Sequence, residues 1–177
     1  MRTAPLLLNL LLAASARAAA PEQVLITYEA NVGARQISGV SHALEWRATA
    51  LGPDAVKVTL RVPIDSFDSG HPEFDALLRA AALSERHPVV EVAGVAHGDR
   101  FEGTLTFRGV SRPLQLQLGM ARLDGFLIAN ASFTLELADF GLVLPSVGPK
   151  IAIDFIGRFP DVPRTVVISG GAVSASR

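Results

Sequence analysis

The clearest signal in the sequence is an alternation of apolar and polar residues with a period of two. In segment 54–64 the apolar residues share one face, and Lys57, Thr59 and Arg61 take the other. Successive side chains of a β-strand point to opposite faces, so this pattern predicts a strand that is buried on one side. Similar alternation predicts strands in segments 101–108, 114–118, 127–137 and 151–159, and weaker patterns predict strands at 24–30, 37–49 and 89–95.

Turn residues separate these eight predicted strands. Gly52-Pro53-Asp54 and Asp124-Gly125 are examples of the Gly, Pro and Asp clusters between them. Many short strands at regular spacing are typical of a β-sandwich or a β-barrel. The sequence therefore predicts an all-β fold, and nothing in it suggests alternating strands and helices.

One segment, 72–83, has the pattern of a helix. Pro72 suits a first helical position, and Asp75 lies in the first turn, where the helix dipole favours an acid. Four apolar residues recur at helical spacing and form one face: Phe74, Leu77, Leu78 and Ala81. We expect this helix to cover one end of the fold as a lid or plug.

The first twenty residues have the pattern of a secretory signal peptide. Arg2 gives a positive start, a leucine-rich stretch follows over residues 6–12, and small residues at 14–18 fit a cleavage site. We therefore predict a signal peptide at 1–20, a single mature domain at 21–177, and export to the periplasm or the cell exterior.

Composition excludes several classes of protein. The formal net charge is -1 and there is no basic run, so the electrostatic footprint of a nucleic-acid-binding protein is absent. Beyond the leucine-rich start, no apolar stretch is long enough for a membrane span. The chain has no cysteine, which excludes disulfides, thiolate nucleophiles, cysteine-bound zinc and lipidation at a cysteine.

The sequence contains no known catalytic or metal-binding motif, but one cluster of acidic residues could form a site. Five side chains between positions 65 and 75 could ligate a divalent ion or act as acid and base: Asp65, Asp68, His71, Glu73 and Asp75. Their spacing matches no known metal loop, and Asp, Ser and Gly are also what turns favour. We favour a structural role at the start of the helix and predict no catalytic residue, metal or cofactor.

Several segments together resemble the YceI-like family. They are 62–70 followed by Asp75-Ala76-Leu77-Leu78, then 87–92, 103–114, and Asp139-Phe140-Gly141-Leu142. The resemblance implies an eight-stranded antiparallel lipocalin-like barrel with one helix-bearing excursion at about 71–86. It further implies export, binding of a polyisoprenoid or similar lipid in the barrel lumen, and no enzymatic activity.

The chain departs from this family at three positions. Phe74 stands where the family usually has a basic residue, Leu77 where it has His, and Leu137 where a basic residue is common. These departures affect contacts to a polar head group more than they affect the barrel.

The leading functional hypothesis is a carrier or sequestering protein for an apolar chain, which could also form a homodimer. Its lumen residues are predicted from the inward faces of the strands, with two helix residues, Phe74 and Leu78, at the mouth. The strand residues are Val58, Leu60, Val62, Leu105, Phe107, Leu116, Phe133, Leu135, Ile153 and Phe155.

Alternation does not distinguish an open lumen from a filled one. Small residues predicted to face inward, such as Gly103, Ala129, Ala131 and Gly157, either leave room or mark tight corners. Trp46 and Tyr28 could line a lumen or belong to an ordinary core. Two alternatives therefore stand beside the carrier: a filled barrel acting through protein–protein contacts, and a metal-dependent hydrolase built on the acidic cluster.

Overall fold

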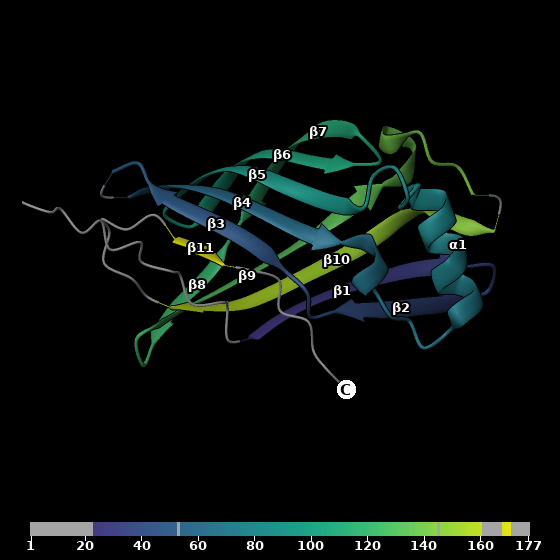
Figure 1. Cartoon of the computed structure of the whole chain (residues 1–177), viewed down its shortest axis with the longest axis horizontal. Coiled ribbons are helices and arrows are strands. Elements are labelled where there is room, and N and C mark those ends of the chain that lie inside the picture. Colours follow the sequence, from purple (N-terminus) through teal and green to yellow (C-terminus); the bar gives the residue numbers. More distant parts are fainter. Residues whose placement is uncertain (1–22, 53, 145, 161–167, 171–177) are drawn as a thin grey trace, which may run out of the picture.

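The computed structural model describes residues 23–52, 54–144, 146–160 and 168–170, and the predicted signal peptide lies outside these ranges. Within them the protein is all-β, with two antiparallel sheets and one α-helix (Figure 1). The all-β prediction is confirmed.

The first sheet has five strands in the order β2-β1-β10-β9-β8. They are β1 (Gln23–Val32), β2 (Arg35–Ser41), β8 (Gly119–Leu123), β9 (Phe126–Glu136) and β10 (Val147–Pro160). The second sheet has six strands in the order β11-β3-β4-β5-β6-β7. They are β3 (Glu45–Ala50), β4 (Ala55–Pro63), β5 (Val89–His97), β6 (Arg100–Phe107), β7 (Val110–Gln117) and β11 (Ile168–Gly170).

The chain passes from one sheet to the other at two corners. Only residues 42–44 separate β2 from β3, and only Leu118 separates β7 from β8. At the first corner β2 pairs with β1 and β3 pairs with β4. At the second corner β7 pairs with β6 and β8 pairs with β9. These corners join the two sheets around a shared interior.

The prediction of an eight-stranded barrel needs correction, because the described residues form eleven strands arranged in two sheets. The predicted strand 37–49 is broken at its corner, where Ser41 Oγ accepts a hydrogen bond from the Ala43 N–H. Leu44, just beyond, is buried, and the buried positions shift from odd residue numbers (Gly39, Ser41) to even ones (Leu44, Trp46) across the break, so the segment is not one alternating strand. Strands β8 and β11 were not predicted, because β8 has no alternation in its burial and β11 has only three residues.

The predicted helix is confirmed as α1 (Pro72–Ala82), with Pro72 in its first turn. It ends at Leu83, which adopts a left-handed conformation (φ 56°) and donates its N–H to the carbonyls of Ala80 and Arg79. Figure 1 shows α1 at one end of the molecule, away from the β3–β4 and β8–β9 hairpins.

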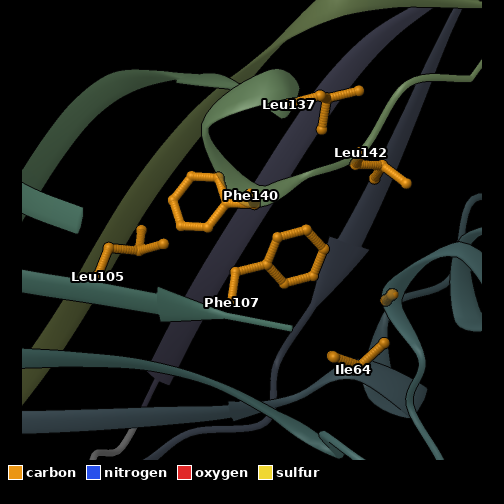
Figure 2. Close-up of a cluster of buried hydrophobic side chains, with 7 residues drawn as sticks. Ile64, Leu105, Phe107, Leu137, Phe140 and Leu142 are labelled. Atoms are coloured by element: carbon orange, nitrogen blue, oxygen red, sulfur yellow. The ribbon is translucent and has the colours of Figure 1, made fainter. Parts of the chain in front are cut away.

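A compact hydrophobic cluster closes the α1 end of the interior (Figure 2). It joins β6, α1 and two short 3₁₀ helices, η1 (Ile64–Ser66) and η2 (Leu137–Phe140). The rings of Phe107 and Phe140 meet edge to face at 5.7 Å. Arg108 Nη1 donates to the carbonyl oxygens of Phe140 (2.8 Å) and Gly141 (2.9 Å), which ties the β6–β7 turn to η2. The buried members are Ile64, Ala82, Leu105, Phe107, Leu137, Phe140 and Leu142.

Candidate ligand-binding cavity

The two sheets enclose a cavity of about 830 Å³. Ligand pockets typically have volumes of roughly 300–1,000 Å³, so this one is large. Its wall is formed by the inward faces of β1, β3–β7, β9 and β10, with two residues of β8 and two of α1. The described interior is therefore not filled by its own side chains, which argues against the filled-barrel hypothesis.

Nearly all the predicted lumen residues lie on this wall. The predicted strand residues all lie on this wall, and so does Leu78 of α1: Val58, Leu60, Val62, Leu78, Leu105, Phe107, Leu116, Phe133, Leu135, Ile153 and Phe155. Phe74 does not lie on it. Its ring stacks on Tyr28, with ring centroids 6.4 Å apart, and lines a small neighbouring pocket. Helical periodicity indicated that Phe74 faces the protein interior, but it could not indicate that its ring packs on Tyr28 and not on the main cavity.

Small inward residues play two different roles. Ala129 and Ala131 lie on the cavity wall and leave space there. A Cβ atom at Gly103 would lie 2.3 Å from the carbonyl oxygen of Ala93 and 2.7 Å from Cα of Gly94, and one at Gly157 would lie 2.6 Å from a ring carbon of Phe159. The alanines thus leave room in the lumen, whereas Gly103 allows β5 to approach closely and Gly157 makes room for an aromatic ring.

The cavity is closed at the α1 end and open at the opposite end. Near α1 its wall includes Ile64, Ala82 and Leu137, each at most 3% exposed. The exposed members of the wall lie at the other end, in or beside the β3–β4, β5–β6 and β8–β9 turns: Gly52, Asp54, Gly98, Met120 and Arg122. Helix α1 is therefore a plug at the closed end, and the prediction that its residues form the mouth is wrong.

Charge is confined to the mouth. Among the described residues, Asp54 and Arg122 are the charged side chains on the wall, and both belong to the open end. The rest of the wall is apolar apart from the edges of Tyr28 and Trp46. An environment of this kind disfavours an ion or a charged group inside, because burying an unpaired charge is costly. It suits an apolar chain.

Tyr28 and Trp46 are both core aromatics and wall residues, at 4% and 6% exposure. Burial, with a smaller effect from the negative charge of Asp75, raises the pKa of Tyr28 to about 12, so this phenol is neutral at physiological pH. The Tyr28 hydroxyl lies near that of Ser69 without a well-aligned hydrogen bond to it. Nε1 of Trp46 is likewise buried without a partner among the described side chains and backbone.

The acidic cluster organises the loop before α1. Asp75 accepts hydrogen bonds from the backbone N–H (3.1 Å) and the hydroxyl (2.6 Å) of Ser69. Asp68 accepts one from the Gly70 N–H at 2.8 Å. Within the described ranges, no three His, Cys, Asp or Glu side chains gather in a way that could hold a metal ion. The hydrolase hypothesis therefore has no assembled site in this part of the chain.

Sequence reasoning missed the wall residues at the mouth and those on β5. Val90, Val92 and Ala96 of β5 lie on the wall, and the weak alternation at 89–95 was a signal that could have placed the two valines there. Met120 and Arg122 of β8 lie in a strand that was not predicted, so no pattern pointed to them.

Comparison with protein families identifies the chain: the model of the YceI-like domain matches residues 20–159. The chain belongs to the YceI-like family. The segments that carried the resemblance in the sequence fall within the matched range. Among curated proteins, none matched the sequence. No helix in the described ranges is long and apolar enough to cross a membrane.

Two solved structures share this fold. The polyisoprenoid-binding domain from Saccharophagus degradans has a TM-score of 0.68 and 14% identity, covering 77% of this chain and 93% of its own. BcnA from Burkholderia cenocepacia has a TM-score of 0.66 and 12% identity, covering 76% of this chain and 95% of its own. At these identities the similarity shows the fold alone.

Proposed function

We propose that the protein is an exported soluble carrier or sequestering protein that holds an apolar chain, a polyisoprenoid or a similar lipid, in its cavity. The observation that carries this proposal is the 830 Å³ cavity, whose described wall is charged at the mouth alone. Each methylene moved from water onto such a wall contributes about 0.8 kcal/mol. A chain of about ten carbons would therefore have a favourable binding free energy of several kcal/mol, even after the entropic cost of ordering it.

Family membership supports the choice of an isoprenoid. One structural relative is described as a polyisoprenoid-binding domain, and this chain shares its fold. The positions at which the chain departs from the family surround α1 and the closed end. Phe74 packs on Tyr28, Leu77 is 41% exposed, and Leu137 is buried in the hydrophobic cluster. None of these side chains can offer a charge to the polar head group of a lipid. We therefore expect the head group to lie away from the closed end.

Export and a binding rather than enzymatic role complete the proposal. The signal-peptide pattern at 1–20 supports the periplasm or the cell exterior as the site of action. Two members of the acidic cluster, Asp68 and Asp75, accept the hydrogen bonds that shape the loop before α1.

The proposal is tested by titrating the delipidated protein with a long-chain prenyl alcohol. Trp46 is the one tryptophan of the chain and lies on the cavity wall, so its fluorescence reports occupancy directly. We expect a saturable change in emission. Ala131→Leu adds volume inside the cavity and should weaken binding by about 5- to 150-fold, because overpacking a confined site costs about 1–3 kcal/mol.

The matched control is Ala152→Leu, which adds the same volume at an exposed position of β10. It should leave the affinity unchanged. Equal affinities for the two variants, with both proteins folded, would show that the alcohol does not occupy the cavity.

A further inference from the structure

Large apolar side chains stand exposed around the mouth of the cavity. Leu51 is 57% exposed, Met120 44% and Leu123 58%. Leu51 adjoins the wall residue Gly52 in the β3–β4 turn, Met120 is itself on the wall, and Leu123 ends β8 beside Arg122. Figure 1 shows the β3–β4 and β8–β9 hairpins at the end opposite α1. We call Leu51, Met120 and Leu123 the rim.

The rim adjoins the apolar wall. Leu118, just before β8, and Leu127, which pairs with Arg122 across β8 and β9, both lie on the wall. Single exposed apolar residues are normal on protein surfaces, but these three lie together at the end where the apolar cavity opens, beside the charged wall residues Asp54 and Arg122. A chain that passes from a membrane into the cavity at this end keeps most of its methylenes covered, whereas a free chain would expose each of them to water.

We propose that the rim docks on the surface of a lipid bilayer, and that the apolar chain passes between the bilayer and the cavity through this contact. The inference rests on the proposed function, because it concerns how the same cavity is loaded or emptied. It assigns the open hairpin end as the membrane-facing end and α1 as the end that faces water.

The charges at this end favour apolar docking over electrostatic docking. Asp54, Asp99 and Asp124 lie in its turns together with Arg100 and Arg122, so both signs are mixed. A surface without a basic excess has no general attraction for anionic lipids. Docking should therefore proceed on zwitterionic phosphatidylcholine vesicles and depend little on salt concentration.

The test measures the rate at which a polyprenyl alcohol passes from phosphatidylcholine vesicles to the full mature protein, with the vesicles removed by sedimentation. The rim variant is Leu51→Ser with Leu123→Ser, since neither side chain lies on the cavity wall. The matched control is Leu25→Ser with Ile156→Ser, a pair of exposed residues that face each other across β1 and β10. We expect the rim variant to lose vesicle binding and to transfer the alcohol at least five-fold more slowly, with the control at the wild-type rate.

A parallel titration with farnesol, added without vesicles, separates the two proposals. Wild-type and rim variant should bind farnesol equally. Equal binding together with an unchanged transfer rate would overturn the membrane contact and leave the carrier function standing. Failure of the wild type to bind farnesol or the polyprenyl alcohol would contradict the carrier function itself. Transfer that requires anionic lipid, or a rim substitution that dissociates a dimer without slowing transfer, would also overturn the inference.

Discussion

Tyr28 is the residue whose environment predicts a measurable dependence on pH. Burial raises its pKa to about 12, against about 10 for an unfolded tyrosine. The folded protein therefore keeps the phenolic proton where the unfolded chain releases it. The stability from this difference is complete below pH 10 and is lost as the pH rises from 10 through 12.

Because Tyr28 is the one tyrosine of the chain, tyrosinate absorbance can be assigned to it. We predict an ionisation midpoint near pH 12 while the far-UV spectrum is still that of the folded protein. Tyr28→Phe should abolish the absorbance change and the associated loss of stability. A midpoint near 10 in the folded protein would show that the hydroxyl is accessible to water.

Gly39 is required by the ring of Tyr28. The two residues face each other across β1 and β2, and a Cβ atom at Gly39 would lie 2.3 Å from Cε1 of the ring. We predict that Gly39→Ala lowers the free energy of unfolding by about 1–3 kcal/mol, because the ring must move within a packed site. Urea denaturation measures this. Gly52→Ala, where the added atom meets open space, is the control and should stay within about 0.5 kcal/mol of wild type.

At the scale of elements, the start of α1 depends on a buried carboxylate. Asp75 is 8% exposed and accepts two hydrogen bonds from Ser69, whereas Glu73 in the same turn is exposed. We predict that Asp75→Ala costs about 1.5–3 kcal/mol of stability, because it leaves the Ser69 donors without a charged acceptor. It should also lower the ionisation midpoint of Tyr28, since the charge of Asp75 helps to raise it. Glu73→Ala should change neither quantity; equal effects of the two substitutions would contradict this role.

The strands show how far sequence periodicity reaches. It assigned the inward face of β4 correctly, because a strand between core and solvent must alternate. It did not detect the corner at 42–44, where the chain changes its hydrogen-bonding partner and the buried positions shift from odd to even residue numbers. Strand β8 is mostly exposed near the mouth and so carries no alternation. Phe74 was misplaced because helical spacing does not specify which part of the protein a face meets.

At the scale of the whole molecule, the open cavity explains why many inward-facing side chains are only partly buried. Val58 and Leu60 of β4 and Val92 of β5 are examples, since they face the interior and yet are only half-buried. An apolar ligand would cover them and would bind only the folded state. It should therefore stabilise the protein by about 2.7 kcal/mol when its concentration is one hundred times its Kd. A rise in the urea midpoint with added prenyl alcohol measures this effect, and an unchanged midpoint would contradict it.

The carrier function is tested most directly by native mass spectrometry, combined with lipid extraction, on mature protein purified gently from the exported fraction. We expect a discrete added mass that extracts into organic solvent and fragments as an isoprenoid or a similar apolar chain. A clean mass of the protein alone, unchanged after incubation with long-chain prenyl compounds, would contradict the carrier function.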